Sequence, residues 1–412
     1  MNMRDSGANH SKRPHVAIVS QNADLALDVR PRMQAIALAS AGFDVTLVGG
    51  TTEPARVQEL TPGLVGLRLF AFPRERSGAK GQVIEQMTAF LRVTRALLSL
   101  GRKHRFDALH ASNPPDNLFL ASVLVHLSGK RHRFVFDQHD VAPVLVIEKF
   151  GEAGLMGMVA RLATWLERRS FARASLVIFA NPEYERRARS AGLLHSPCQV
   201  VPNGWQLPAA EIDVKWRSGA RHLVVYVGAI NEQDNVEHLV EAVAHLQHRS
   251  GLRVVVAGDG AALESVRELA RELGIGDCFN WLGWVRDRTV VASLVRSADV
   301  CVAPELDNPF NRLACFVKVI EYMSVGAAVV ANRLHQTEEV GGDAVRYAGD
   351  MTSESFARAI ESLLADREAA RELGDRARTR FEETIQWERV GSPRLVEAYE
   401  ALFGTPAGGR QT

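Results

Sequence analysis

HVAIVSQNADLALDVRPRMQAIALASAGFDVTLVG, residues 15–49, is the stretch that decides the fold class of this chain. It opens with a short apolar run rich in branched residues (15–21), which is typical of a buried strand. Apolar residues at helical spacing follow and end at Gly42, before a second apolar run, FDVTLVG (43–49). Strand, helix and strand within about 35 residues form a βαβ unit, which predicts parallel pairing with a right-handed crossover.

The same alternation continues along the chain and restarts once. FDALHAS (106–112) and RFVFDQH (133–139) are further expected strands of the first half. Residues 206–221 are polar and lack hydrophobic periodicity, and the pattern begins again with HLVVYVG (222–228). Two such arrays predict an α/β protein with two Rossmann-like, doubly wound parallel-sheet domains. Because ligands of these sheets bind beyond the carboxyl ends of the strands, we expect the two domains to face an interdomain cleft.

These patterns also predict the limits of the domains. We expect a loose tail at 1–13, an N-terminal domain at 14–205, a linker at 206–221, a C-terminal domain at 222–385, a C-terminal helix within 386–403 that packs back on the N-terminal domain, and a tail at 404–412.

The composition is that of an ordinary soluble globular protein, with 46% hydrophobic and 24% charged residues among 412. No apolar run approaches the roughly 18–20 residues that span a bilayer, and the polar N-terminus does not resemble a secretory signal. The four cysteines are scattered without a CxxC pair, which argues against disulfides and against a zinc site. We therefore expect a cytoplasmic protein.

The charge is unevenly distributed along the chain. Residues 1–206 hold 26 Lys and Arg against 17 Asp and Glu, a net +9, so the rest of the chain is negative overall. The basic segments 92–105 and 161–174 could lie on an anionic membrane surface, at the inner face of the membrane, or bind a phosphate-bearing acceptor. Their apolar residues are equally what a helix packed on a sheet requires. Binding to nucleic acid is disfavoured, because the net charge of the chain is only +1.

DNPFNRLACFVKVIEYMSVGAAVVAN, residues 307–332, is the strongest candidate for chemistry. Its polar loop precedes a short helix that ends at Gly326. Lys318 and Glu321 are three residues apart, so they share one face of this helix, and Lys318 lies in the first turn, where free N–H groups favour an anion. A diphosphate could bind there, with the Glu321 carboxylate accepting hydrogen bonds from two ribose hydroxyls. The alternative interpretation is an ordinary solvated ion pair on a helix.

This segment resembles the donor-binding motif of glycosyltransferase family 4, whose members have the GT-B fold. The similarity is greatest to a branch from bacterial capsule, exopolysaccharide and O-antigen pathways. The matching residues are Lys318, Glu321, Tyr322, Met323, Gly326, Val329 and Val330. Four more matches occur in the order of the family: NPPDNLF (113–119), FDQHD with Pro143 and KFG (136–151), VVPNG (200–204) and VVVAGDG (254–260).

The resemblance implies roles for individual residues. Glu321 would bind the ribose of a nucleotide-sugar, Lys318 would neutralise its diphosphate, and His139 would reach the donor sugar near the reacting carbon. A structural alternative for His139 is a hydrogen-bonded edge residue between Asp137 and Asp140. The further donor-side residues are Gly228, Gly258, Gly260, Asn308, Phe310, Asn311, Arg312, Val317 and Tyr322, and the interdomain or acceptor side comprises Asp137, Asp140, Asn203 and Gly204.

The implied activity is transfer of a sugar to a glycan, a lipid-linked acceptor or a small molecule, with retention, no metal and no cofactor. The chain departs from the family pattern at several positions. Leu313 stands where most members have a first glutamate, Ala229 and Asp234 where many have an Arg and a Lys, and Val144 where the branch usually has Glu. These departures leave Lys318, together with Arg312, as the expected cations. They also leave two alternative functions open. The chain could be a catalytically silent homologue that binds a partner, or an epimerase that acts on the nucleotide-sugar itself.

Overall fold

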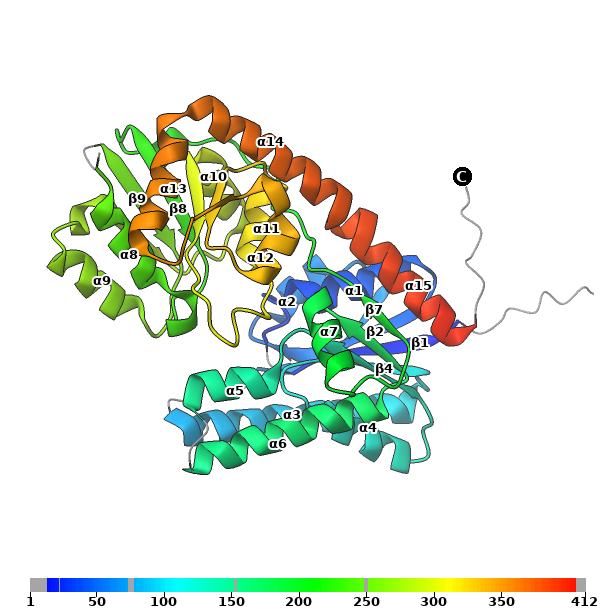
Figure 1. The fold of residues 1–412 in the computed structure, drawn as a ribbon. Coiled ribbons are helices and arrows are strands. Elements are labelled where there is room, and N and C mark those ends of the chain that lie inside the picture. Colours follow the sequence, from blue (N-terminus) through cyan, green and yellow to red (C-terminus); the bar gives the residue numbers. More distant parts are fainter. Residues whose placement is uncertain (1–12, 22, 73–77, 152–153, 248–250, 405–412) are drawn as a thin grey trace, which may run out of the picture. The chain divides into compact units, whose positions relative to one another are not determined.

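The computed structural model of the chain describes residues 13–21, 23–72, 78–151, 154–247 and 251–404 (Figure 1). Almost all of the two predicted tails therefore lies outside the described residues. The chain divides into two compact units. Unit 1 comprises Met1–Ala180, Glu185–Val200 and Arg394–Thr412, and unit 2 comprises Asn181–Tyr184 and Val201–Pro393.

Unit 1 is built on a parallel sheet of seven strands in the order β3-β2-β1-β4-β5-β6-β7. The pairing of His15 with Asp44 and of Val16 with Ala108 places β1 between β2 and β4, where the strand order reverses. The predicted βαβ unit and parallel pairing are thus confirmed. The strands are β1 (His15–Ser20), β2 (Asp44–Thr51), β3 (Val65–Ala71), β4 (Ala108–Ser112), β5 (Arg133–Gln138), β6 (Leu176–Phe179) and β7 (Cys198–Val200).

Helices connect these strands, as the crossover of parallel pairs requires. Three of them, α3, α4 and α6, gather on one side of the unit 1 sheet in Figure 1, and α4 packs against both of the others. The helices are α1 (Val29–Ser40), α2 (Pro54–Leu60), α3 (Gly78–Lys103), α4 (Leu118–Leu127), α5 (Ala142–Phe150), α6 (Gly154–Arg173) and α7 (Pro182–Ser190).

The last helix of the chain, α15 (Ser392–Phe403), packs within unit 1. Its Tyr399 ring is fully buried and meets Phe43 edge-to-face at 5.8 Å between ring centroids. The helix lies within the predicted segment 386–403, and the preceding Trp387–Gly391 form a wider π-helical turn that belongs to unit 2.

Unit 2 contains a parallel sheet of six strands in the order β10-β9-β8-β11-β12-β13. This is the Rossmann order, with the reversal between β8 and β11. The strands are β8 (His222–Val227), β9 (Leu252–Ala257), β10 (Phe279–Gly283), β11 (Val300–Ala303), β12 (Val329–Ala331) and β13 (Arg346–Tyr347). The helices are α8 (Val236–His245), α9 (Leu263–Glu272), α10 (Arg288–Ser297), α11 (Val317–Ser324), α12 (His335–Gly341), α13 (Ser353–Ala365) and α14 (Arg367–Thr384).

The unit 2 sheet is buried on both faces, which explains why its strands are continuous apolar runs. Val224 and Val254 belong to one core cluster, and their neighbours Val225 and Val255 belong to the other. Successive side chains of a strand point to opposite faces, so the two clusters lie on the two sides of the sheet.

Residues 206–221 do not form the predicted linker between domains; they pack on unit 2 instead. Leu207 is buried, and its N–H donates to the Ser324 hydroxyl at 3.2 Å. Arg217 makes two hydrogen bonds of 2.7 Å to the Asp299 carboxylate. The polar composition of the segment gave no indication of these contacts with unit 2.

Two glycines allow α11 and α14 to approach closely. Gly326, which follows α11 in a left-handed conformation with φ +73°, confirms the predicted helix end. Its carbonyl oxygen would lie 2.1 Å from a Cβ placed on Gly374 in α14. Since this contact is with backbone, an added methyl group on Gly374 could be accommodated only by moving a helix.

We predict that Gly374→Ala destabilises unit 2 by about 1–3 kcal/mol, because overpacking outweighs the better helix propensity of alanine. Gly101→Ala in α3 is the matched control, since its added Cβ would meet only side-chain atoms at 3.7 Å or more. This substitution should stabilise the protein by about 0.5–1 kcal/mol. Thermal unfolding followed by circular dichroism measures both changes, and equal effects of the two substitutions would contradict the packing argument.

Candidate functional site

A pocket of about 240 Å³ lies at the carboxyl ends of β8, β9 and β10 in unit 2, beside α11. This position next to the reversal of strand order is where doubly wound sheets bind ligands. Of the predicted donor-side residues, Gly228, Val317, Lys318 and Glu321 line the pocket. The other lining residues are Val227, Ala229, Ala257, Trp284, Val285, Arg288 and Val291.

The Lys318 ammonium is held by several groups of unit 2. Its Nζ forms a salt bridge with Glu305, donates to the Tyr226 hydroxyl at 2.8 Å and lies 3.7 Å from the Asp234 carboxylate. Burial by itself would lower the pKa of this lysine, but Glu305, Tyr226 and Asp234 together outweigh burial and raise the pKa above its ordinary value. Lys318 is therefore protonated and fixed in position, and the neighbouring carboxylates of Glu305 and Asp234 offset part of its charge.

Tyr226 connects this ammonium to the pocket wall. Its hydroxyl accepts from Lys318 and donates to the Ala229 carbonyl at 2.5 Å. A Cβ on Gly228 would meet the Lys318 Cε atom at 2.8 Å. The lysine stem thus lies directly against the backbone that follows β8, which explains the glycine at this position.

Glu321 lies one helical turn after Lys318, and its side chain is 9% exposed. It forms a salt bridge with Arg288 and a hydrogen bond with the Trp205 side chain. Burial raises the pKa of Glu321, although Arg288 acts in the opposite direction. The predicted solvated (i, i+3) pair with Lys318 is not formed, because each of the two residues has a different partner.

Two predicted donor-side residues are structural instead. Tyr322 is fully buried under the sheet, and its hydroxyl accepts from the Val227 N–H at 2.8 Å. Asn311 is also fully buried, and its amide donates to the carbonyls of Leu306 and Gln233 at 2.8 and 2.9 Å. Both side chains hold backbone in place and are too enclosed to contact a ligand, so these two predictions are corrected.

The loop that precedes α11 also differs from expectation. Arg312 is exposed and makes two hydrogen bonds of 2.7 Å to Asp307, so it is outside the pocket lining described above. Asn308 accepts from the Asn311 N–H at 2.7 Å and stabilises the turn, and Phe310 is half-buried. The second cation of the pocket is Arg288, at the start of α10, and not Arg312.

Gly258 and Gly260 approach other backbone of unit 2 closely. A Cβ on Gly258 would lie 1.9 Å from the Gly228 carbonyl oxygen, and one on Gly260 would lie 2.3 Å from the Ile230 carbonyl oxygen. The glycines therefore let the turn after β9 pack against the turn after β8. This close packing explains them without the contact to a nucleotide that the resemblance implied.

Sequence reasoning missed several residues of this site, namely Glu305, Tyr226, Arg288, Trp284 and Trp205. Glu305 and Trp284 follow β11 and β10, and Arg288 begins α10, so each lies at the carboxyl edge of the sheet. Tyr226 lies within β8, near its carboxyl end. Their mutual contacts were not accessible, since these depend on which strands are neighbours.

In unit 1, His139 follows β5 and belongs to a buried network of polar side chains. Its Nε2 lies 2.6 Å from the Oδ2 of Asp137, which also accepts from Arg30 and from the Gln34 amide at 2.7 Å. Although burial alone would raise the pKa of Asp137, Arg30 and the His139 ring hold it well below its usual range. Asp137 is thus a fully buried carboxylate, and the predicted edge-residue hydrogen bonds of His139 are present.

The backbone of His139 and Asp140 is fixed by Asn113. The Asn113 side-chain oxygen accepts from the N–H groups of His139 and Asp140 at 2.5 and 3.2 Å. Its amide donates to the Asp140 carbonyl and to Asp116 Oδ1, both at 2.7 Å. The motifs NPPD and DQHD, predicted as separate signatures, are therefore parts of one local structure.

Gly204 lies within unit 2 against the segment that precedes α15. A Cβ on Gly204 would fall 1.7 Å from the Ile385 carbonyl oxygen, and the Trp387 N–H donates to the Gly204 carbonyl at 2.7 Å. Asn203, the neighbouring predicted residue, is half-buried. The VVPNG segment is therefore tied to the part of the chain that leads back to unit 1.

Two Rossmann-like parallel sheets in one chain, one of them with a pocket beside α11, define the GT-B class of folds. Residues 27–204 match the model of the glycosyl transferase 4-like domain, and residues 221–366 match the model of glycosyl transferases group 1. Together these matches cover most of the chain. The chain therefore belongs to the group 1, family-4-like glycosyltransferases.

Named relatives and solved structures agree with this family. The chain is 25% identical over 203 residues to the GDP-mannose-dependent alpha-(1-6)-phosphatidylinositol dimannoside mannosyltransferase of Mycobacterium tuberculosis, which covers 49% of this chain and 50% of that protein. The alignments with the curated relatives span about half of their length.

Two solved structures share the fold over nearly the whole chain. Sucrose-phosphate synthase from Thermosynechococcus elongatus has a TM-score of 0.73 at 19% identity and covers 96% of this chain and 100% of its own. HepE of Anabaena, in complex with UDP-glucose, has a TM-score of 0.68 at 15% identity and covers 94% and 99%. At these identities the similarity establishes the fold.

The pKa of Asp116 provides a test of the unit 1 network. Burial raises this pKa to about 7, and the second carboxylate oxygen has no hydrogen-bond partner among the described residues. Between the ordinary pKa of 3.8 and about 7, the folded chain keeps a proton that the unfolded chain has lost. The free energy of unfolding therefore decreases as the pH rises through this window.

We predict that Asp116→Asn removes this dependence. The stability of the variant relative to the wild type should increase by about 3 kcal/mol between pH 5 and pH 8, since one pKa unit corresponds to about 1.4 kcal/mol. Urea unfolding at the two pH values measures the difference. Asp44→Asn, at the exposed start of β2, is the control for the substitution itself. An unchanged difference at the two pH values would show that Asp116 is ionised in the folded protein.

Proposed function

We propose that the protein transfers a sugar from a nucleotide-sugar donor to a hydroxyl of a glycan, a lipid-linked acceptor or a small molecule, with retention and without a metal. The main support is the pocket at the carboxyl edge of the unit 2 sheet, where Glu321 and Lys318 lie in the first two turns of α11. Family membership supports the reaction type. Two of the similar proteins are named for use of GDP-mannose and for binding of UDP-glucose, which supports a nucleotide-sugar as donor.

The donor nucleotide is assigned to the pocket by its mixed lining. Trp284 is 56% exposed and offers a flat face on which a base can stack. The Glu321 carboxylate is the acceptor for the two vicinal hydroxyls of a ribose. Its Oε1 is engaged by Arg288, whose side chain is 42% exposed and can therefore turn toward the phosphates when a ribose displaces it.

The diphosphate is assigned to the start of α11. There the free N–H groups of the first turn and the positive end of the helix dipole favour an anion. Glu305 and Tyr226 hold the Lys318 ammonium in one orientation, so its remaining N–H donor is ready for a phosphate oxygen without further reorganisation.

The reaction then depends mainly on the departure of the nucleoside diphosphate. Fixed donors at the phosphates stabilise the charge that develops on the leaving group, and no protein nucleophile is required. Retention follows if the acceptor hydroxyl attacks the face from which the diphosphate leaves. We assign His139 to the donor sugar, as the family resemblance implies. Among the described residues, no group of three or more His, Cys, Asp or Glu side chains is arranged to hold a metal ion.

A catalytically silent homologue is the second candidate, and one observation favours it. Three carboxylates, those of Glu305, Asp234 and Glu321, surround the two cations Lys318 and Arg288. This arrangement is more negative than expected for a site that binds a diphosphate. Binding measurements with nucleotides distinguish the two candidates.

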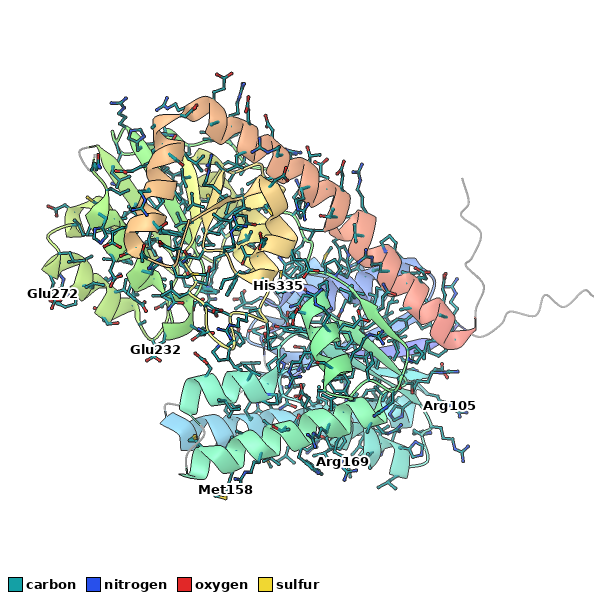
Figure 2. All side chains as sticks on the ribbon, in the orientation of Figure 1. Arg105, Met158, Arg169, Glu232, Glu272 and His335 are labelled. Atoms are coloured by element: carbon teal, nitrogen blue, oxygen red, sulfur yellow. The ribbon has the colours of Figure 1, made fainter. Side chains whose placement is uncertain are left out.

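We further propose that unit 1 binds peripherally to the anionic inner face of a membrane. Three neighbouring helices expose apolar side chains at helical spacing: Ile84, Met87 and Leu91 on α3, Leu120, Leu124 and Leu127 on α4, and Met158, Leu162 and Trp165 on α6. Figure 2 shows Met158 and Arg169 at the outer surface of α6.

Arginines accompany these apolar stripes. Arg161, Arg168 and Arg169 are exposed on α6, whereas its carboxylate, Glu167, is buried and paired with Arg187. An apolar face flanked by cations suits the interfacial region of an anionic bilayer, to which each basic side chain adds about 1 kcal/mol. No helix among the described residues has the length and apolar character needed to cross a membrane.

Donor binding is the first prediction of this proposal. Glu321→Ala should weaken the binding of UDP, GDP or ADP, whichever the wild type binds, by more than about tenfold, because hydrogen bonds to a charged group are lost. The double variant Lys318→Met, Glu305→Gln should show a similar loss. The pair is replaced together because a buried Glu305 without its lysine would destabilise the fold by about 3–5 kcal/mol. Calorimetric titration measures the affinities.

Glu268→Ala is the matched control for this experiment, since Glu268 forms an exposed (i, i+3) pair with Arg271 on α9. It should leave nucleotide binding unchanged. Wild-type affinity in both site variants would remove the donor assignment. Absence of binding to every nucleoside diphosphate and nucleotide-sugar, in a folded wild-type protein, would favour the silent homologue.

Membrane binding is the second prediction. Leu162→Ser with Trp165→Ser should reduce binding to vesicles of phosphatidylcholine and phosphatidylglycerol by at least about tenfold, because two large apolar groups no longer enter the bilayer. Sedimentation with vesicles measures the bound fraction. Leu60→Ser with Leu64→Ser is the control, as these residues are exposed elsewhere in unit 1. Failure of the wild type to bind anionic vesicles at low salt would refute the proposal.

A further inference from the structure

Four side chains of unit 1 form a continuous chain of hydrogen bonds from the last helix to His139. The Tyr399 hydroxyl on α15 lies 2.7 Å from His110 Nδ1, and His110 Nε2 lies 3.1 Å from Asp137 Oδ2. The same carboxylate oxygen lies 2.6 Å from His139 Nε2. Tyr399, His110 and Asp137 are fully buried, whereas the His139 side chain is 17% exposed.

The direction of each hydrogen bond follows from the charges. Asp137 is ionised and can only accept, so both histidines must present an Nε2–H to it. Burial lowers the pKa of His110, which is therefore neutral and has its free lone pair on Nδ1. Tyr399 must then donate its hydroxyl proton to that nitrogen. From Tyr399 through His110 to Asp137 there is thus one consistent arrangement of protons, in which each donor fixes the next acceptor.

Other groups contact Asp137 and the His139 ring. The Arg30 guanidinium donates to both oxygens of Asp137, and the Gln34 amide donates to Oδ2. The Arg30 Nε–H also points at His139 Nε2 at 3.0 Å, which would favour the other tautomer, but the shorter contact of 2.6 Å between Nε2 and the charged Asp137 oxygen outweighs it. Asp28, which accepts from the Ser20 hydroxyl at 3.0 Å, is a second carboxylate near the His139 ring. His139 is thus oriented by Asp137, and Asp137 is oriented by groups from α1 and β4 and, through His110, from α15.

We propose that Tyr399 and His110 are positioning residues, which act through Asp137 to fix the tautomer and orientation of the His139 ring. The proposal rests on the proposed function, since it makes α15 part of the machinery that places His139 at the donor sugar. With Nε2–H committed to Asp137, the Nδ1 atom of a neutral His139 is an acceptor and can receive a hydrogen bond from a substrate hydroxyl.

Packing alone does not account for these polar groups. The Tyr399 ring stacks on His110 at 6.1 Å and contacts Phe43 and Phe403, and a phenylalanine would make the same ring contacts. A buried hydroxyl and a buried imidazole are costly to desolvate, and here they are compensated by their contact with one another and with Asp137. Since a phenylalanine at position 399 would pack equally well, packing alone does not explain why the hydroxyl and the imidazole are buried here.

The test separates positioning from packing. Tyr399→Phe should lower kcat on the order of tenfold, the scale on which outer hydrogen-bond partners act in other sites, and leave KM for the donor within about twofold. His110→Gln keeps a donor toward Asp137 and an acceptor toward Tyr399, so it should retain more activity than His110→Leu. Tyr347→Phe, which removes a hydroxyl bonded to the Thr337 carbonyl at 3.1 Å in unit 2, and Phe403→Leu are the controls and should keep kcat.

The ring nitrogens supply a readout that does not depend on turnover. In protein labelled with nitrogen-15 at histidine, His110 and His139 should both show Nε2 protonated and Nδ1 unprotonated. Tyr399→Phe should shift the His139 signals, and Phe403→Leu should leave them in place. Wild-type kcat together with unchanged His139 signals in Tyr399→Phe would overturn the proposal, as would a His110 protonated at Nδ1.

The two readouts also separate this proposal from the proposed function. A wild type that transfers no sugar from any donor tested, but shows the expected tautomers and their response to Tyr399→Phe, would refute the transferase activity and retain the positioning role of Tyr399 and His110. An active wild type whose His139 signals do not respond to Tyr399→Phe would refute the positioning role and retain the transferase activity.

Discussion

The parallel sheet that is buried on both faces is the constraint on which the rest of this structure depends. Such a sheet tolerates little but apolar side chains along its strands, as Val224 and Val225 on opposite faces of β8 illustrate. Polar chemistry is therefore displaced to the carboxyl edge, where the strands end and the connections begin. In unit 1 this edge supplies His139 and Asn113, and in unit 2 it supplies Glu305 and Gly228.

Both edges solve the same electrostatic problem with different residues. A charge at the end of a buried strand loses its water, and it is retained only if partners replace that water. Unit 1 surrounds the Asp137 carboxylate with Arg30 and two histidines, whereas unit 2 surrounds the Lys318 ammonium with Glu305 and Tyr226. In unit 1 the buried carboxylate also contacts the His139 ring, whose side chain is 17% exposed.

Sequence patterns predicted the elements well because apolar periodicity reflects burial directly. They gave the correct first residue of β8 and placed Glu321 one turn after Lys318, whereas the family motif assigned Tyr322, a core residue, to the donor. On a helix packed against a sheet, neighbouring residues face opposite environments, and spacing alone does not reveal which face is covered. The partner of Lys318 was not predictable either, because Glu305 is 13 residues away and reaches it only once α11 packs beside β11.

The surplus of carboxylates around the two cations of the unit 2 pocket constrains how an anionic ligand can be held there. Lys318 and Arg288 face Glu305, Asp234 and Glu321, so net positive charge cannot be the source of affinity. Backbone N–H groups at the start of α11 are not neutralised in this way, since their dipoles are fixed and have no counter-ion to displace. Arg288 becomes available only when another group takes its place on Glu321. Ribose binding and phosphate binding would therefore be coupled through one carboxylate, and a ligand with only one of these parts would bind much less well than the whole nucleotide.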